Sequence, residues 1–379
     1  MSQENSKLKA RLKLRIDKGN LRTLKITDNK LIDFTSNDYL GLSKNLTLKT
    51  NIIERYVANS DLNGSTGSRL LTGNSIQIEQ LEAKLSKLFY APKTLLFSSG
   101  YMANLAFSSS VPQKNDVILY DELCHASIKD GCRLSLAQKF SFKHNDIAQL
   151  KTKLENCKPE SSIYVAIEAV YSMDGDFARI DEIAKLCDLH SAKLIVDEAH
   201  STGIWGDQGS GFVKSKRLEN KVFARIMTFG KAMGIHGACI CCGELLRNYL
   251  INFSRPFIYT TAPGPFELVA ISEAFEFIKE HHQLEVSLKK NIHLFKKEIG
   301  LSSKEIIESN SPIQVIKIAG NENAIKLSLH LSKSGYDIRA ITSPTVPIGD
   351  ERLRVCIHAF NTDDEILRLC HLLNAYFKK

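Results

Sequence analysis

The sequence predicts an α/β fold with two parts: a large domain built on a mainly parallel sheet, and a smaller α+β domain at the C-terminal end. Three observations support this. Short apolar runs alternate with helical patterns from about residue 94 onward, polar residues directly follow several of these runs, and the pattern changes after a proline-rich passage at residues 256–265. Strands that alternate with helices are typical of a parallel sheet covered on both faces. The length of 379 residues is sufficient for both domains.

The predicted strands of the large domain are short, apolar and bounded by polar residues or glycine. Between two of them, Ile180, Ile183, Ala184 and Cys187 recur at the spacing of one helix face. The apolar stretch 239–242 is also typical of a strand. The other predicted strands are residues 95–97, 117–119, 163–167, 194–196 and 226–229.

The C-terminal pattern predicts one long helix over residues 266–299, then strands at 313–318 and 353–357 with a helix over 324–334 between them. We therefore expect an N-terminal helix and arm over residues 1–40, a large domain over 41–265 and a small domain over 266–379. The first 18 residues alternate basic residues and leucine, which predicts an amphipathic helix.

Composition narrows the class of protein. Hydrophobic residues make up 43% and charged residues 24%, as in ordinary globular proteins. The formal net charge is +8, but no run of five basic residues occurs, so we expect no nucleic-acid partner. No apolar run approaches the roughly 18 to 20 residues that span a membrane.

The nine cysteines are irregularly spaced. This pattern predicts reduced, buried thiols and a cytoplasmic protein. A metal site at the cysteines of residues 239–242 is the alternative, but no second pair at ligand spacing accompanies them, so we expect no metal.

Polar segments follow several predicted strands, at the sheet edge where α/β proteins bind ligands. Residues 98–104 follow the strand 95–97 and open a helical pattern with small residues, which favours binding of an anion such as phosphate. Ser172 follows the strand 163–167 and is a candidate hydrogen-bond donor; an ordinary turn at Asp174 and Gly175 is the alternative.

An aspartate and a lysine end two further strands. Asp197 is placed to hold a protonated ring nitrogen through a charge-assisted bond. The string DEAH at 197–200 also matches a helicase motif, but that reading requires a phosphate loop G-x-x-x-x-G-K-[ST], which the sequence lacks. Lys231 follows the strand 226–229, where desolvation would make its amine a Schiff-base nucleophile.

Together these segments identify a resemblance to the α-oxoamine synthase family, over residues 21–358. The order of anion-binding turn, strand-end aspartate and strand-end lysine is the one in which fold-type I enzymes present their cofactor site. The matching stretches are FTSNDYLGL (34–42), GSTGSRLLTG (64–73), SGYMAN (99–104), EAVYSMDG (168–175), VDEAHSTG (196–203), TFGK (228–231), SPTVP (343–347) and RLR (352–354).

The resemblance implies the aminotransferase-like fold of pyridoxal 5′-phosphate (PLP) enzymes and assigns catalytic roles. Lys231 is expected to carry the cofactor as a Schiff base and to move the proton at Cα of the substrate. Asp197 is expected to pair with the pyridine nitrogen and His125 to stack on the ring. His200 and Ser172 are the implied partners of the phenolic oxygen of the ring. The implied phosphate ligands are Ser99, Gly100, Tyr101, Thr228 and, from a partner subunit, Thr260.

The resemblance also implies substrates and a homodimer with shared active sites. Asn37 and Arg354 are expected to clamp the carboxylate of an amino acid, a task suited to the guanidinium group. One branch of the family joins L-alanine to a pimeloyl thioester and releases CO2, and Arg22 matches an arginine near the acyl-chain entrance there. Thr342 stands where many members of that branch have arginine. A glycine-using acetyltransferase, a serine-using long-chain synthase and a non-catalytic regulatory subunit remain alternatives.

Overall fold

A computed structural model describes residues 2–24, 26, 28 and 30–378 of the chain. The chain forms two compact units, which we describe separately. The first comprises Met1–Asn37, Met173–Asp176 and Ser287–Lys379, and the second comprises Asp38–Ser172 and Phe177–Val286. The predicted division of the chain at residues 40 and 265 stays a prediction.

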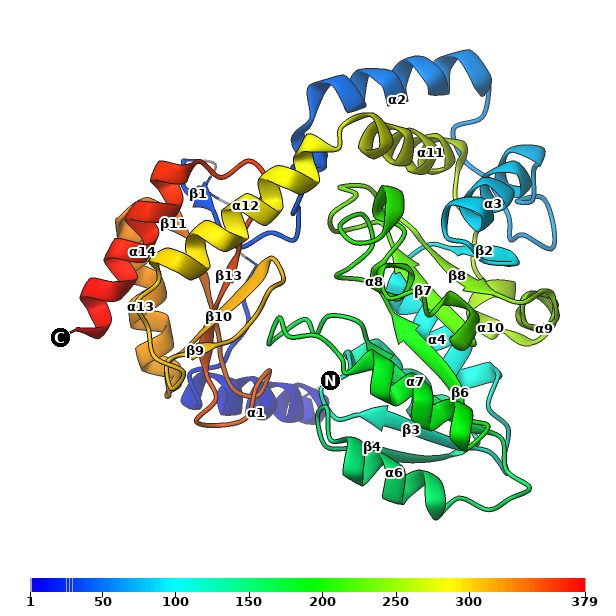
Figure 1. The fold of residues 1–379 in the computed structure, drawn as a ribbon, viewed down its shortest axis with the longest axis horizontal. Coiled ribbons are helices and arrows are strands. Elements are labelled where there is room, and N and C mark those ends of the chain that lie inside the picture. Colours follow the sequence, from blue (N-terminus) through cyan, green and yellow to red (C-terminus); the bar gives the residue numbers. More distant parts are fainter. Residues whose placement is uncertain (1, 25, 27, 29, 379) are drawn as a thin grey trace. The chain divides into compact units, whose positions relative to one another are not determined.

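The second unit is built on a seven-stranded sheet, coloured cyan to green in Figure 1. Strand β8 runs against its neighbours β2 and β7, and the remaining neighbours pair in parallel, so the sheet is mainly parallel as predicted. In spatial order the strands are β2 (Lys93–Phe97), β8 (Ala238–Cys242), β7 (Ala224–Thr228), β6 (Lys193–Asp197), β5 (Ile163–Glu168), β3 (Val117–Asp121) and β4 (Gln138–Phe142).

Two apolar cores lie against this sheet. One packs Val165 and Ile167 of β5 against helices α5, α6, α7 and α8, and the other packs Tyr164 of the same strand against α4, α9 and α10. Because successive side chains of a strand point to opposite faces, the two cores lie on opposite faces of the sheet. The helices of the unit are α2 (Leu46–Asn59), α3 (Ile76–Leu88), α4 (Gly100–Ser110), α5 (Ala126–Leu134), α6 (Ile147–Glu155), α7 (Ile180–Leu189), α8 (Phe212–Ser215), α9 (Glu244–Phe253), α10 (Arg255–Ile258) and α11 (Pro265–Glu280).

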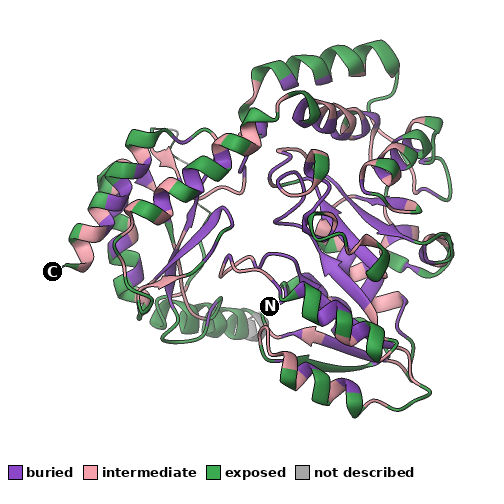
Figure 2. Cartoon of the chain, in the orientation of Figure 1, coloured by how far each residue is buried: buried purple, intermediate pink, exposed green. Residues whose placement is uncertain are grey.

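Burial explains why these strands were visible in the sequence. All residues of β5, β7 and β8 are buried, drawn in purple in Figure 2, and most of them are apolar. The strand β4 was not predicted. It lies at the edge of the sheet with its first four residues exposed, so it carries polar residues and shows no apolar run.

The first unit contains a four-stranded antiparallel sheet in the order β12 (Arg339–Ile341), β13 (Arg352–Cys356), β10 (Ile313–Lys317) and β9 (Ile306–Ile307). A parallel pair joins β1 (Ile32–Asp33) to β11 (Tyr336–Asp337). Its helices are α1 (Ser2–Asp17), α12 (Gln283–Glu298), α13 (Asn321–Lys333) and α14 (Asp363–Phe377).

The single helix predicted over residues 266–299 is wrong. The segment forms α11 and α12, which are separated at His281 and His282. The backbone of His281 leaves helical geometry (φ −122°, ψ 54°), and Nδ1 of its ring lies 2.8 Å from the carbonyl oxygen of Phe277. Side-chain contacts with the backbone carbonyls of the last turn are a known way for a helix to end, and the apolar periodicity on either side concealed this break.

All nine cysteines are free, and eight of them are buried. Within the described ranges, no helix has the length and apolar character needed to cross a membrane. In the same part of the chain, no three His, Cys, Asp or Glu side chains cluster as metal ligands would.

Candidate active site

The ends of β5 and β6 bring two carboxyl groups together. Glu168 and Asp197 are register partners on these parallel strands, so their side chains leave the same face of the sheet. Both are buried. One oxygen of Asp197 accepts a hydrogen bond from Nδ2 of Asn104 at 2.7 Å, and the other accepts from the backbone N–H of Ala199 at 2.8 Å. These donors fix the orientation of the Asp197 carboxylate.

Lys231 lies beside His200. The amine Nζ of Lys231 is 2.8 Å from Nε2 of His200, and Nδ1 of the same ring is 2.8 Å from the hydroxyl of Tyr39. Tyr39 is fully buried and His200 nearly so. When Lys231 is protonated it can only donate, so Nε2 accepts and the ring proton is on Nδ1, which donates to Tyr39. Tyr39 therefore orients the imidazole that contacts the lysine.

The turn after Lys231 requires glycine at position 234. The backbone N–H of Gly234 donates to the carbonyl oxygen of Lys231 at 2.8 Å, and its φ of +64° is in the left-handed region. A Cβ atom there would lie 2.4 Å from the backbone nitrogen of Ser43. This turn fixes where the chain bends after Lys231.

Helix α4 opens beside the end of β7. The hydroxyl of Ser99 caps the helix by accepting from the N–H of Met102, and the first turn presents backbone N–H groups, a feature that favours anion binding. A Cβ atom on Gly100 would lie 2.4 Å from Cγ2 of Thr228, so only glycine permits this close approach. The hydroxyl of Tyr101 donates to Asp130 at 2.6 Å.

His125 caps the next helix, α5. Its Nδ1 lies 2.8 Å from the hydroxyl of Ser127, which also contacts Asn104. His125 as a whole residue is exposed, but protein atoms shield its ring nitrogens from water. This desolvation lowers the pKa of His125. The positive charge of Lys231 lowers that pKa further, while the negative charge of Asp197 opposes both effects. The ring is thus within electrostatic reach of both residues.

The two residues assigned to the substrate carboxylate lie in the first unit and contact each other. Nη2 of Arg354 donates to Oδ1 of Asn37 at 2.8 Å. The neighbouring Arg352 forms an ion pair with Asp174 instead. Arg22 is exposed, and its Nη2 donates to the hydroxyl of Thr345 at 3.2 Å.

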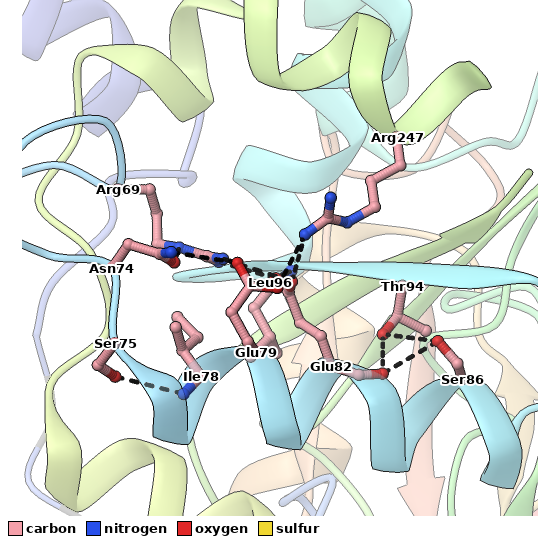
Figure 3. Close-up of polar contacts among 10 residues, drawn as sticks. All are labelled: Arg69, Asn74, Ser75, Ile78, Glu79, Glu82, Ser86, Thr94, Leu96 and Arg247. Carbon is pink, nitrogen blue, oxygen red and sulfur yellow. Dashed lines mark hydrogen bonds and ion pairs between the residues drawn. The ribbon is translucent and has the colours of Figure 1, made fainter. Parts of the chain in front are cut away.

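A buried ion-pair network anchors the segment 64–73 (Figure 3). Nη1 of Arg69 donates to Glu82 at 2.7 Å, and Nη2 of Arg247 donates to the same carboxylate at 3.1 Å. The backbone N–H of Leu96, in β2, also donates to Glu82 at 2.8 Å. The network therefore ties this segment to the central sheet.

Thr260 lies in a surface groove of about 710 Å³, which Met102 of α4 also lines. The groove is also lined by exposed apolar side chains of Leu134, Leu136, Phe253 and Tyr259. No contact between Thr260 and the Lys231–His200 pair is present among the described residues.

The groups gathered at the strand ends fit pyridoxal phosphate. An amine, a fixed and buried carboxylate and an imidazole are the partners that a carbonyl, a ring nitrogen and a phenolic oxygen require. The first turn of α4 supplies N–H donors for a phosphate group. The glycine at position 100 leaves no side chain between that turn and Thr228.

The family model for aminotransferase class I and II matches residues 29–373, so the chain belongs to that family. It is an enzyme that uses pyridoxal 5′-phosphate. Its similarity to α-oxoamine synthases extends over nearly the whole chain.

Three similar proteins illustrate this. The 8-amino-7-oxononanoate synthase of Emericella nidulans is 38% identical over 98% of this chain and 95% of its own length. The structure of that enzyme from Francisella tularensis is 32% identical, with a TM-score of 0.78 over 93% of this chain and 99% of the other. The serine palmitoyltransferase of S. paucimobilis is 25% identical, with a TM-score of 0.87 over 98% and 96%.

Three residues near the site were given no role in the sequence analysis: Tyr39, Asn104 and Glu168. Each lies within a motif that carried the family resemblance. Asn104 is a polar residue on the buried side of α4, which is a signal of a buried polar contact. Tyr39 is separated from its partner His200 by 161 residues, and no local pattern connects the two.

Proposed function

We propose that the chain condenses an amino acid with an acyl thioester and releases CO2 and a free thiol. The favoured substrates are L-alanine and a pimeloyl thioester, and the product is then 8-amino-7-oxononanoate, in biotin synthesis. The observation that carries this proposal is the hydrogen-bonded series Lys231–His200–Tyr39, together with the buried Asp197 carboxylate. Identity of 38% over 98% of the chain to a synthase of that name supports the choice of reaction.

When bound, pyridoxal phosphate supplies an electron sink for the electron pair released as a bond to Cα breaks. Asp197, held by Asn104 and Ala199, keeps the pyridine nitrogen protonated. Lys231 would hold the cofactor covalently and would move the proton at Cα of the substrate.

The remaining assigned residues bind and orient. His200 and Ser172 would hold the phenolic oxygen of the bound cofactor, and His125 would pack against its ring. The phosphate is bound by Ser99, Gly100 and Tyr101 at the start of α4, with Thr228.

The carboxylate of the amino acid is bound by Arg354, which Asn37 orients. Arg22 contacts the far end of the acyl chain. These two assignments place recognition of the two substrates on different residues, so they can be tested separately.

A second candidate is a serine-using, long-chain reaction. The fold of the chain overlaps more completely with serine palmitoyltransferase (TM-score 0.87) than with the 8-amino-7-oxononanoate synthase structure (0.78). Sequence identity favours the synthase, 32% against 25%. We give the identity more weight, because substrate choice depends on side chains rather than on the backbone path.

A product assay separates these reactions. L-alanine, glycine and L-serine are each combined with pimeloyl-, acetyl- and palmitoyl-CoA, and the released thiol and CO2 are measured. We expect the highest kcat/KM for L-alanine with pimeloyl-CoA. Preference for glycine with acetyl-CoA, or for serine with palmitoyl-CoA, would contradict the proposal. Absence of turnover with every pair, in protein that binds PLP, would favour a non-catalytic role.

We also propose a homodimer in which the partner subunit's Thr260 completes the phosphate site. The exposed apolar side chains around Thr260 support a partner at this groove, because apolar patches of this kind mark interaction surfaces. Mixing the inactive variants Lys231→Ala and Thr260→Glu should restore about a quarter of the sites if subunits exchange randomly. A fully active monomer in sedimentation would contradict this arrangement.

We further propose a cytoplasmic location. Nine free cysteines, eight of them buried, support a reducing compartment. Fractionation of cells that express the tagged protein tests this.

A further inference from the structure

Glu168 is a buried acid to which the proposed mechanism assigns no role. It ends β5, its side chain is in the interior, and Asp197 is its register partner on β6. Two carboxylates so placed in a dry site repel each other, and one of them keeps a proton.

Hydrogen bonding decides which of the two is charged. Asp197 accepts from Asn104 at 2.7 Å and from Ala199 at 2.8 Å, so both of its oxygens have a donor. Glu168 accepts the backbone N–H of Ser172 at 3.3 Å through one oxygen, and its other oxygen, Oε1, has no hydrogen-bond partner among the described residues. The carboxylate that accepts the shorter hydrogen bonds is the one stabilised as an anion.

We propose that Glu168 carries a proton while Asp197 is ionised. Glu168 is then a positioning residue: it keeps a single negative charge at this edge of the sheet and holds the segment that carries Ser172. The link to the pyridine nitrogen rests on the proposed function, whereas the proton on Glu168 depends on the protein alone.

The surroundings of Glu168 agree with a neutral acid. Burial, followed by the charge of Asp197, raises the pKa of Glu168 to about 8. Lys231 and the backbone amides of His125 and Ser172 act in the opposite direction. The pKa of the buried Cys124 thiol is raised well above its ordinary value, first by burial and then by the charge of Glu168 when that group is ionised.

A second buried group near this carboxyl is the Tyr171 hydroxyl. Burial raises the pKa of Tyr171 well above its ordinary value, with smaller contributions from Cys124, Asp121 and Glu168. Both Cys124 and Tyr171 thus remain uncharged near neutral pH. Lys231 is the positive group, and Asp197 the negative group, that act most strongly on Glu168.

The proton on Glu168 has a measurable consequence in the cofactor-free chain. The folded state keeps this proton up to about pH 8, whereas a glutamate in the unfolded chain loses it near the ordinary pKa of 4.5. Between these values folding takes up a proton, so this group makes the folded state less stable as pH rises. Glu168→Gln cannot ionise and lacks this effect.

The test is urea unfolding of cofactor-free wild type and Glu168→Gln from pH 5 to 8. We expect the ratio of their unfolding equilibrium constants, wild type over variant, to rise with pH by up to ~10-fold per unit. The exposed Glu160 gives the matched control, Glu160→Gln, for which the ratio should stay constant. A constant ratio for Glu168→Gln as well would overturn the proposal.

Two further measurements complete the test. If Glu168→Gln does not fold, infrared spectroscopy of wild type at pH 7 decides: a protonated-carboxyl band that disappears above about pH 8 supports the proposal, and its absence overturns it. For the positioning role, PLP titration should give Glu168→Gln an affinity near wild type and Glu168→Leu a weaker one, since leucine cannot accept the Ser172 N–H. Equal affinities would contradict that role. Because urea unfolding and infrared spectra use no cofactor, their failure is distinguishable from failure of the proposed function.

Discussion

The amine of Lys231 and Nε2 of His200 lie 2.8 Å apart, and the buried hydroxyl of Tyr39 contacts the opposite nitrogen of the same ring. These two hydrogen bonds join three segments that are far apart in the sequence. They give the lysine a hydrogen-bonding partner whose orientation is fixed from the protein interior.

Lys231→Ala should abolish turnover, because both the covalent attachment of PLP and the proton transfer at Cα depend on this amine. Borohydride reduction of the wild-type holoenzyme should fix the cofactor to the peptide that contains Lys231, as mass spectrometry would detect. Lys185→Ala, at an exposed position on α7, is the control and should keep full activity. Label on a different lysine would refute the assignment.

Asp197→Asn should lower kcat by at least ~10²-fold, equivalent to about 2.7 kcal/mol of transition-state stabilisation. The variant removes the negative charge that keeps the ring nitrogen protonated. It also places an amide where Asn104 and Ala199 both donate. Steady-state kinetics beside the exposed Asp181→Asn control measure the effect. Near-normal turnover would mean that a charge at position 197 is not required.

Tyr39→Phe should keep the fold but remove the hydrogen bond between Nδ1 of His200 and the hydroxyl of residue 39. We expect kcat/KM to fall by about 5- to 10-fold, since one hydrogen bond contributes about 1 kcal/mol. Tyr336→Phe removes a comparable hydroxyl, which donates to the carbonyl of Glu365 at 3.3 Å, and should leave kcat/KM unchanged. Equal effects of both variants would indicate a general loss of stability rather than a role for Tyr39 in orienting His200.

Arg69→Ala should destabilise the fold by about 3 kcal/mol, because it removes one partner from a buried ion pair. The side chains of Arg69 and Glu82 are only 6% and 4% exposed. Arg55→Ala breaks the pair with Glu273, in which the arginine is 62% exposed, and should cost below about 1 kcal/mol. Urea unfolding measures both. If Arg69→Ala lowers the free energy of unfolding as little as Arg55→Ala does, the Figure 3 network does not stabilise the fold.

Arg22→Ala should raise KM for the pimeloyl thioester and leave KM for L-alanine unchanged, since the residue is assigned to the far end of the acyl chain. Glycine should remain a poor but measurable substrate, because rejection based on one methyl group amounts to only ~1–3 kcal/mol. Steady-state kinetics with both substrates varied test the two statements. An unchanged KM for the thioester would remove Arg22 from the substrate site.

The sequence predicted the central sheet because its inner strands are buried on both faces and therefore consist mostly of apolar residues, as in β5 and β8. It predicted the candidate site residues because polar groups such as Asp197 stand directly after such runs. The edge strand β4 and the break at His281 were missed, since neither interrupts or creates an apolar pattern.

The contacts that orient the site could not be predicted from the sequence alone. Tyr39 and His200 are distant in sequence, and their contact depends on tertiary structure. The proton proposed for Glu168 depends on Asp197, which becomes its neighbour only because β5 and β6 pair in one register. Such pairwise effects arise from packing between elements rather than from the pattern within one element.

The buried cysteines allow unfolding of the protein to be followed through the reactivity of their thiols. Burial raises the pKa of Cys132, Cys187, Cys242 and Cys370 to about 12, so these thiols are almost wholly protonated at neutral pH and shielded from reagents. Cys157 is half-buried, and the other eight thiols are in the interior. A reagent that releases a coloured product on reaction with thiols should therefore react slowly with Cys157 in the native enzyme. It should react with the other eight thiols only as the protein unfolds. The appearance of colour would then report the rate of unfolding without any added label.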